Sequence, residues 1–378
     1  MPTEEILFIT HKNFADDHSP EGGVKYCTLE YIALLESGYK VNILKVEYNR
    51  SFLYRVKAKL GIDAYEDYDP GASHAAIALL ISRHNIRNIF INLSNASQFA
   101  GYIKTRFPTA NLKLILCSHG NESGDFLHQS VRFKKTMPFF KRIFSTYRLG
   151  LILKKELLFR LCYFDLILTV SEIEKNLEYW LGAKCVYMVP RVFKKQFLHR
   201  EPIQNTAGFI GDLSHYPNHY GLSELCAALE KIPGSARIKI FVSGHIHPNL
   251  TALAGKYKFL HPLGYLDNEI LEKEASGWCY FLNPVFYYSK GVSTKLEKAM
   301  NWGLPVLSTP AGNRGYEFGD HSITTYANAS EMASALIFKM ADPQQMKEDK
   351  AAVEKIVSES PDYKEHIKNI QNLLENIS

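Results

Sequence analysis

A glycine, a serine and a lysine occur within five residues in Gly291-Val292-Ser293-Thr294-Lys295, where a loop is expected to lead into a short helix. The first N–H groups of a helix have no partner inside it, and the helix dipole places positive charge at the same end. This end suits a phosphate group, and Lys295 would add a cation one turn into the helix. The segment therefore predicts a phosphate-binding loop, with an ordinary connection between a helix and a strand as the alternative.

Two other expected strands are followed by residues that could contact a phosphate or a sugar. Gly22 and Gly23 precede a helix expected at 24–36, and paired glycines let a backbone approach such a group closely. A flexible glycine hinge is the alternative. His119 follows the strand expected at 112–117, where it could bind a sugar hydroxyl, transfer a proton or be purely structural.

Further polar loops follow the strands in the second half of the chain. Gly211 would let a ligand approach the backbone, Asp212 lies beside it, and Asn218 is expected to cap the next helix. Earlier in the chain, Ser171 and Glu174 have the spacing of a helix capping box, which is a structural role.

Ser243 and His245 follow the strand expected at 238–242, and they are expected beside a nucleotide base or ribose. His245 and His247 could ligate a metal, but no Asp, Glu or Cys neighbour completes a ligand set. We therefore expect no metal site.

Short apolar runs alternate with helical patterns along the whole chain, which is typical of parallel strands covered by helices on both faces. The first series of strands is expected at 6–10, 41–46, 88–92, 112–117, 166–170 and 186–189. The second series is expected at 208–210, 238–242, 259–261, 278–282, 305–308 and 322–326. The pattern predicts an α/β protein with two Rossmann-like domains, whose ligands bind outside the carboxyl ends of the strands.

The expected domain boundary lies in a polar, weakly periodic stretch. Residues 1–190 would form the first domain, with a basic amphipathic insert at 124–162, and 191–206 would be a linker. The second domain would cover 207–360, and 361–378 would be a C-terminal helix able to pack on either domain.

Composition indicates an ordinary globular protein. The 378 residues are 46% hydrophobic and 22% charged, so the chain is long and apolar enough to bury two cores. The net charge is +5. No signal peptide or membrane-spanning run is recognised, and the six cysteines show neither metal-ligand spacing nor a disulfide framework. We expect a reducing, cytoplasmic compartment.

Basic and large apolar residues are interleaved between 132 and 160, and Glu156 is the only acidic residue there. This pattern suits a helix lying on an anionic membrane. A solvated charged helix and a binding site for single-stranded RNA are the alternatives. Of the three interpretations we favour the membrane surface, and we expect no nucleic-acid partner. The residues expected to meet the acceptor or the membrane are Arg132, Lys134, Lys135, Lys141 and Arg142.

Together these loops resemble the GT-B superfamily of nucleotide-sugar glycosyltransferases. The likeness is specifically to bacterial enzymes of the large retaining family 4, also called glycosyl transferases group 1. The most specific matches are residues 209–218 and 291–309. Weaker matches are Gly22-Gly23, His119, 165–171 and 189–190.

The resemblance implies two facing domains with a cleft between them, an N-terminal domain for the acceptor and a C-terminal domain for the nucleotide-sugar donor. His119 would contact the transferred sugar, and Lys295 would neutralise the departing diphosphate without a metal or other cofactor. The implied donor-binding residues are Gly22, Gly23, Gly211, Asp212, Ser243, His245, Lys290, Gly291, Val292, Ser293, Thr294 and Glu297.

The chain departs from the family at two positions. The family commonly has two glutamates with seven residues between them, and their places are taken here by Lys290 and Lys298. Glu297 is one position off, which is about 100° around a helix. Either a local register shift brings Glu297 to the ribose, or the nucleotide is held differently. Retention or inversion at the sugar is left open.

The expected function is transfer of a sugar to a hydroxyl of a glycan or lipid-linked glycan in bacterial surface polysaccharide or lipopolysaccharide synthesis, with peripheral attachment to the inner face of the cell membrane. A non-catalytic, sugar-nucleotide-binding subunit of a membrane assembly is the alternative, and a sugar-nucleotide 2-epimerase is a third. The sequence names neither the base, the sugar, the acceptor nor the oligomeric state.

Overall fold

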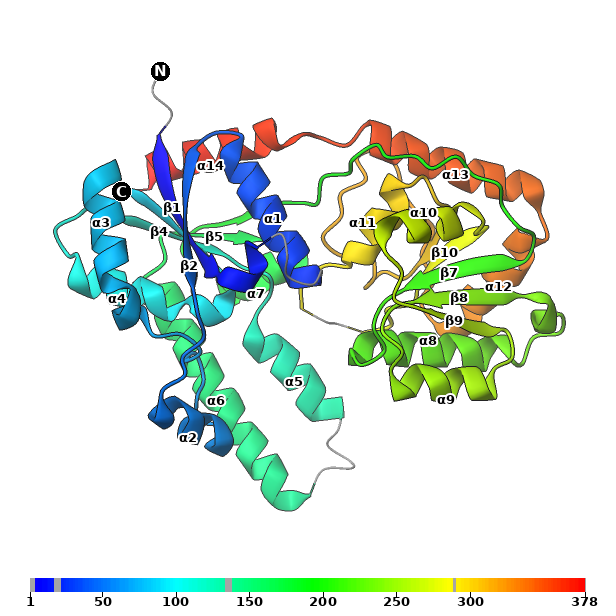
Figure 1. Ribbon diagram of the computed structural model, residues 1–378, viewed down its shortest axis with the longest axis horizontal. Coiled ribbons are helices and arrows are strands. Elements are labelled where there is room, and N and C mark those ends of the chain that lie inside the picture. The colour runs from blue at the N-terminus through cyan, green and yellow to red at the C-terminus, as the bar shows by residue number, and fades with distance from the viewer. Residues whose placement is uncertain (1–3, 17–21, 133–137, 288–289, 378) are drawn as a thin grey trace. The chain divides into compact units, whose positions relative to one another are not determined.

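The computed structural model describes residues 4–16, 22–132, 138–287 and 290–377, and it divides into two compact units (Figure 1). The first unit comprises Met1–Pro190, Ser289–Val292 and Asp362–Ser378. The second comprises Arg191–Tyr288 and Ser293–Pro361. The chain thus changes unit at Pro190, and residues 191–205, without a regular helix or strand, belong to the second unit.

The first unit is built on a six-stranded sheet in the order β2-β1-β3-β4-β5-β6, and every neighbouring pair is parallel. Its strands are β1 (Glu5–His11), β2 (Lys40–Val46), β3 (Asn88–Asn92), β4 (Lys113–Cys117), β5 (Leu166–Thr169) and β6 (Val186–Met188). Ile6 and Phe8 of β1 belong to the core on one face, and Leu7 and Ile9 to the core on the other. Burial on both faces explains the unbroken apolar runs in the sequence.

Helices cover both faces of this sheet. The helices of the first unit are α1 (Gly23–Glu36), α2 (Phe52–Leu60), α3 (His74–His84), α4 (Gln98–Arg106), α5 (Glu122–Arg132), α6 (Phe139–Cys162), α7 (Glu172–Trp180) and α14 (Tyr363–Asn376), and α2 lies away from the sheet. The C-terminal helix α14 packs against α1 and buries Ile367, Ile370 and Leu374 in the same core as Phe8. The C-terminal helix therefore completes the first unit.

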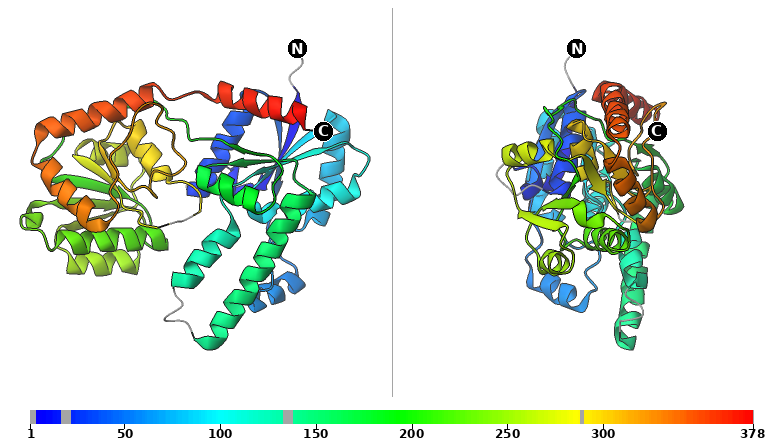
Figure 2. Two further views of the ribbon diagram at one scale, coloured as in Figure 1. Left: turned by 180° about the vertical axis from the view of Figure 1, so that it is seen from behind. Right: turned by 90° about the vertical axis from the view of Figure 1, so that its right-hand side faces the viewer.

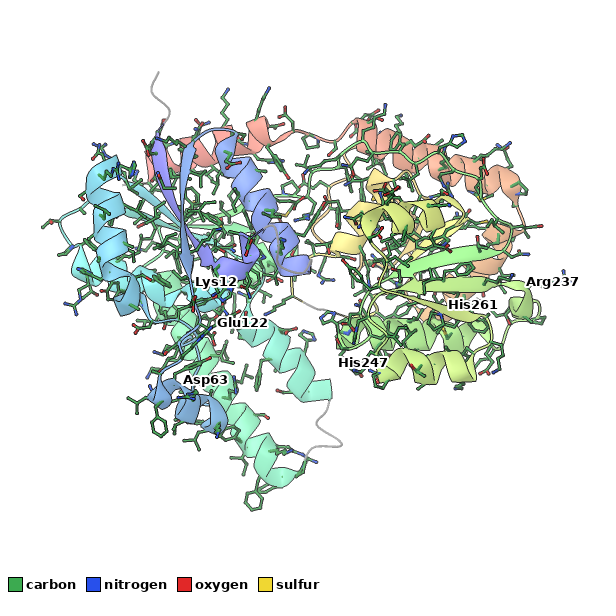
Figure 3. All side chains as sticks on the ribbon, viewed as in Figure 1. Lys12, Asp63, Glu122, Arg237, His247 and His261 are labelled. Atoms are coloured by element: carbon green, nitrogen blue, oxygen red, sulfur yellow. The ribbon has the colours of Figure 1, made fainter. Side chains whose placement is uncertain are left out.

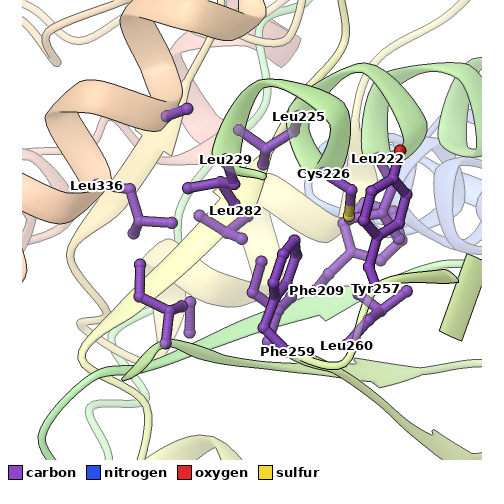
Figure 4. Close-up of a cluster of buried hydrophobic side chains, with 14 of the residues drawn as sticks. Phe209, Leu222, Leu225, Cys226, Leu229, Tyr257, Phe259, Leu260, Leu282 and Leu336 are labelled. Carbon is purple, nitrogen blue, oxygen red and sulfur yellow. The ribbon is translucent and has the colours of Figure 1, made fainter. Parts of the chain in front are cut away.

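The second unit has a five-stranded parallel sheet in the order β11-β10-β7-β8-β9. Its strands are β7 (Thr206–Ile210), β8 (Lys239–Ser243), β9 (Leu260–Gly264), β10 (Tyr280–Asn283) and β11 (Val306–Ser308). Its helices are α8 (Tyr216–Leu229), α9 (Pro248–Lys256), α10 (Asn268–Ser276), α11 (Thr294–Asn301), α12 (Ala329–Met340) and α13 (Pro343–Ser358). Phe209, Leu222 and Leu336 lie in the core that joins β7 to α8 and α12 (Figure 4).

Two local expectations are wrong. The strand expected at 322–326 is reduced to one isolated bridge between Ser308 and Thr325, because this stretch is polar and mostly exposed. Asn218 does not cap the following helix, which begins two residues earlier at Tyr216 with His215 as its N-cap. Pro217 sets this earlier start, since proline suits the first turn of a helix.

Candidate functional site

The expected phosphate loop leads into α11 in the second unit. Its N-cap residue, Ser293, makes no side-chain hydrogen bond to the first turn of the helix. The Ser293 hydroxyl instead donates to Asn283 Oδ1 at 2.9 Å, at the carboxyl end of β10. Tyr316 holds the same residue from the other side, with its hydroxyl 2.6 Å from the Ser293 carbonyl oxygen. The loop is thus fixed by its surroundings, and the Ser293 side chain does not cap the first turn of α11.

Lys295 lies on the first turn of α11 with its ammonium group withdrawn from water. Its Nζ donates to Asn218 Oδ1 at 2.6 Å and lies 4.4 Å from the centre of the Phe209 ring. Burial, and then the neighbouring Arg314 guanidinium, lower the pKa of Lys295 to about 7. The pair of cations beside a helix N-terminus makes a site for an anion.

The loops after β7 and β8 meet through glycines. A Cβ on Gly244 would lie 2.5 Å from the Gly211 carbonyl oxygen, and one on Gly211 would lie 2.9 Å from Asn218 Nδ2. Glycine at these positions is therefore explained by packing of the protein itself. Asp212 accepts from the Ser214 N–H at 2.7 Å, and His245 is exposed next to it.

Glu297 and Ser243, which were predicted to contact the donor, instead make contacts in the interior of the second unit. Glu297 is fully buried and accepts from Arg191 Nε at 2.7 Å, so it presents no surface to a ribose. Its position one residue off the family motif turns it into the interior, as the helical offset implies. Ser243 is also buried, and its hydroxyl donates to the Gly264 carbonyl oxygen at 3.4 Å. We correct both predictions to structural roles.

Lys298, at the second glutamate position, lies at the surface. Its Nζ is 2.6 Å from Asn268 Oδ1 and 5.2 Å from the centre of the Trp302 ring.

In the first unit, His119 follows β4 in a buried position. Its Nε2 lies 2.8 Å from Asn92 Oδ1. The Asn92 amide donates to Thr10 and Thr28, so Oδ1 is the accepting end and Nε2 carries the proton. Burial, with Lys290 adding to it, lowers the pKa of His119 to about 3. His119 is therefore neutral at physiological pH, and its Nδ1 is a buried acceptor without a hydrogen-bond partner among the described residues.

Lys290 and Gly291 lie beside His119 in the first unit. Lys290 Nζ is 2.8 and 2.9 Å from the two carboxylate oxygens of Glu122, which is labelled in Figure 3. Burial opposes its charge, but the Glu122 carboxylate raises the pKa of Lys290 above its usual value. Gly291 adopts a φ of +74°, which favours glycine, and its N–H donates to Glu174 Oε1 at 3.3 Å.

A buried carboxylate supports the loop that carries Glu122. Glu156 Oε1 accepts from the N–H groups of Glu122 and Ser123 at 3.0 and 3.1 Å, and from the Tyr65 hydroxyl at 2.6 Å. It thus caps the first turn of α5, which the sequence does not suggest. The expected cap at Ser171 is confirmed, since its hydroxyl accepts from the Glu174 N–H at 3.2 Å.

Gly22 and Gly23 lie at the start of α1. Gly22 is the N-cap with an extended φ of −172°, and no described atom lies within 4 Å of where its Cβ would be. Neither backbone conformation nor packing within the described residues accounts for glycine at this position.

The basic stretch is divided by the structure. Lys134, Lys135 and the side chain of Arg132 lie outside the described residues, whereas Lys141 and Arg142 are exposed on α6. Arg160 is not a surface cation, because it is fully buried in a bidentate ion pair with Glu178. Its Nε and Nη2 atoms lie 2.7 and 2.9 Å from the two carboxylate oxygens.

The described residues include neither a membrane-spanning helix nor a cluster of metal-binding side chains. No helix there is long and apolar enough to cross a membrane. No group of three or more His, Cys, Asp or Glu side chains in those ranges could hold a metal ion.

Several residues at these sites were not predicted from the sequence as functional residues. Arg314, Glu122, Glu174 and Asn92 join the predicted residues only through folding. Asn92 and Glu122 could have been suspected, because each lies at or just after the carboxyl end of a predicted strand.

The comparisons with known proteins agree with this architecture. Residues 204–342 match the family described as "Glycosyl transferases group 1". No curated protein sequence matches the chain. Sucrose-phosphate synthase from Thermosynechococcus elongatus is similar in structure, with a TM-score of 0.69 at 15% identity over 98% of both chains.

Two further solved structures are similar over nearly their whole length. Anabaena Alr3699/HepE, in complex with UDP and glucose, has a TM-score of 0.58 at 15% identity and covers 98% of this chain and 99% of its own. WaaG, described as a glycosyltransferase involved in lipopolysaccharide biosynthesis, has a TM-score of 0.60 at 14% identity, covering 98% and 100%.

The chain therefore has the GT-B fold, and its resemblance to the GT-B glycosyltransferases is confirmed. Residues 204–342, which match the group 1 glycosyltransferase family, include α8, α11 and Lys295. Glycosyl transfer is the general activity that these matches support.

Proposed function

We propose that this protein moves a sugar from a nucleoside-diphosphate sugar to a hydroxyl group of a glycan or lipid-linked glycan. The observation that carries the proposal is the desolvated Lys295 ammonium beside Arg314, at the start of α11, with the neutral Asn218 as its hydrogen-bond partner. Two neighbouring cations repel each other in the free protein, and a bound diphosphate would neutralise both.

In the reaction, the bond between the anomeric carbon and the diphosphate oxygen breaks, the acceptor hydroxyl oxygen forms the new bond to that carbon, and the hydroxyl proton passes to the departing diphosphate. Negative charge grows on the departing diphosphate, where Lys295, Arg314 and the helix N-terminus stabilise it. These groups supply the positive charge that a metal ion would otherwise bring, so we propose that transfer needs no metal.

His119 would bind the transferred sugar. Because its Nδ1 is a buried acceptor and the ring stays neutral, the suitable partner is a sugar hydroxyl that donates a hydrogen bond. A pKa of about 3 makes His119 a poor general acid near neutral pH. Gly22 and Gly23 would allow the donor to approach the start of α1.

We propose that the acceptor belongs to a bacterial surface polysaccharide or lipopolysaccharide. WaaG, which is similar in fold, is described as acting in lipopolysaccharide biosynthesis, and HepE was solved with UDP and glucose. We further propose a cytoplasmic protein held at the inner face of the cell membrane, on the basis of the exposed Lys141 and Arg142.

A non-catalytic sugar-nucleotide-binding subunit is the second candidate. Both positions of the family's glutamates hold lysines, and Lys290 is already engaged by Glu122. Slow hydrolysis of the donor without acceptor would count against this candidate, because a purely binding subunit releases no nucleotide.

The proposed function is tested by thermal stabilisation with UDP-, GDP-, dTDP- and CMP-linked sugars in the presence of a chelator. One nucleotide class should stabilise the wild type, and Lys295→Ala should remove the effect. Lys256→Ala is the matched control, since its Nζ also lies over an aromatic ring, 4.7 Å from the centre of Tyr257, but at the far end of α9. Stabilisation by no donor, or equal stabilisation of Lys295→Ala, would overturn the proposed donor site.

His119→Ala separates binding from catalysis. It should keep the nucleotide-induced stabilisation while lowering donor turnover by about a hundredfold, the usual cost of losing one well-placed hydrogen bond to the reacting group. Unchanged turnover would exclude His119 from the sugar site.

A further inference from the structure

The helix α2 has no buried residue, although it is well formed. Its apolar side chains form one exposed stripe of Phe52, Leu53, Val56 and Leu60, at helical spacing. Phe52 and Leu53 are each 72% exposed. A nine-residue helix is marginal in water by itself, so this stripe lacks the covering that usually stabilises an amphipathic helix.

Polar contacts hold α2 from its ends and its inner side. Ser51 caps the N-terminus by accepting from the Tyr54 N–H at 3.2 Å. Tyr54 donates to Asp67 at 2.9 Å, and Lys57 pairs with Glu66 at 2.7 Å. The helix is therefore held with its apolar stripe facing outward.

The first half of α6 repeats the same pattern. Its exposed side chains are Phe139, Phe140, Ile143, Phe144 and Tyr147, and Phe140 is 83% exposed. The buried residues of α6 begin only at Ile152. This half of the helix extends beyond the core that anchors the other half.

The two apolar stripes are neighbours in space. A Cβ on Gly61, which ends α2 in the left-handed conformation, would lie 2.6 Å from the Phe144 ring. Arg148 of α6 pairs with Asp63 just after α2, at 3.4 Å. Figures 1 and 2 show α2 beside α6 from opposite sides.

The charge around these stripes is positive. Arg55 and Lys59 on α2 and Lys141 and Arg142 on α6 are exposed. No acidic residue occurs on α2 or between 139 and 155 of α6. The acids that follow α2, Asp63, Glu66 and Asp67, are each engaged by a contact named above. Exposed aromatic and aliphatic side chains ringed by cations fit an anionic lipid bilayer.

We infer that α2 and residues 139–148 of α6 form one composite membrane-docking surface, in which the apolar stripe of α2 enters the bilayer beside Phe139 and Phe140. This deepens the membrane contact proposed above by adding α2, which the sequence pattern did not include. Lipid binding here does not require catalysis, so it is tested independently of the proposed glycosyl transfer.

The test is co-flotation of the full-length protein with vesicles of phosphatidylcholine alone, or with roughly a third phosphatidylglycerol. Binding should need the anionic lipid and weaken at about 0.5 M salt, because screening removes the attraction of the cations. Leu53→Glu and Phe140→Glu should each lower the partition coefficient at least about tenfold, since each places a charge where an apolar side chain would enter the lipid. Circular dichroism checks that both variants are folded.

Phe338→Glu is the matched control. Phe338 is 67% exposed on α12 of the second unit, outside the proposed surface, and its replacement should leave binding unchanged. The inference is overturned if the wild type binds neither vesicle or binds both equally. It is also overturned if Leu53→Glu binds like the wild type, or if Phe338→Glu loses binding as strongly. Loss of a solution dimer in Leu53→Glu would instead assign the stripe to a second copy of the chain.

Discussion

Lys295 is the residue whose environment in the free protein points most directly to a ligand. Burial and Arg314 both disfavour its charge, and its hydrogen-bond partner Asn218 is neutral. A buried cation whose hydrogen-bond partner is neutral favours an anion that brings a negative charge.

The pKa of Lys295 predicts how donor binding depends on pH. Below about 7 the ammonium is already charged, and a donor diphosphate binds without proton uptake. Above this value a proton must be taken up on binding, so affinity should fall as pH rises through 7, by up to about tenfold per pH unit. Calorimetry with the donor that stabilises the protein measures this slope. Lys295→Arg should flatten it, and a flat wild-type profile would contradict the assignment.

The role of Glu297 is decided by its angular position around helix α11. Its carboxylate is fully buried against Arg191, so Glu297→Ala removes one partner of a buried ion pair and should cost about 3–5 kcal/mol of the free energy of unfolding. Denaturant unfolding measures the loss. Glu354→Ala, which breaks the more exposed pair with Lys350 on α13, should cost less than about 1 kcal/mol. Wild-type stability combined with lost nucleotide affinity in Glu297→Ala would restore the ribose role.

At the scale of elements, the loops that follow the parallel strands lie at one end of each sheet. Tight packing of the strands fixes the positions of these loops. Gly208 in β7 shows how tight this packing is, because a Cβ there would lie 1.8 Å from Trp278 Cε3. The ring of Trp278 is fully buried and cannot move aside cheaply.

Gly208→Ala should therefore destabilise the second unit by about 3 kcal/mol, since overpacking forces shifts in the surrounding core. Urea unfolding followed by circular dichroism measures the change. Gly255→Ala on α9 is the control, because nothing lies within 4 Å of its Cβ position, and it should be neutral or stabilising by up to about 1 kcal/mol. Equal stability of the two variants would show that β7 tolerates the added methyl group.

At the scale of the whole molecule, each unit gathers segments that are far apart in the sequence. The first unit includes Ser289–Val292 from between β10 and α11, and it includes α14 from the end of the chain. Lys290 thereby comes to lie against Glu122, and Ile367, Ile370 and Leu374 come to lie in the core with Phe8.

Deleting residues 362–378 should destabilise the first unit although its sheet is left intact. Three buried aliphatic side chains would be lost, at about 1.5–3 kcal/mol each. Hydrogen exchange should accelerate in β1 and α1, which share this core, and stay unchanged in β7–β11. Glu375→Ala, an exposed change on the same helix, should leave exchange unaltered. Uniform acceleration in both units would contradict an effect confined to the first.

The sequence by itself determined the two series of parallel strands, because residues buried on both faces of a sheet leave continuous apolar runs. Eleven of the twelve expected strands occur in the structure. Ser322–Tyr326 does not form a strand, because its polar, exposed residues bury too little apolar surface to stabilise strand pairing. The sequence also located the loop at Lys295, because glycines and a cation before a helix leave a local signal.

Only the tertiary structure decided which charges meet. Arg314 lies near Lys295, and Glu122 pairs with Lys290. Arg191 pairs with Glu297 in the interior. These pairs join residues far apart in the sequence, and no local pattern encodes them. It also decided that α2 and α6 lie side by side with their apolar stripes uncovered. Side-chain charge and burial depend on packing between distant segments, and that packing is a property of the folded chain as a whole.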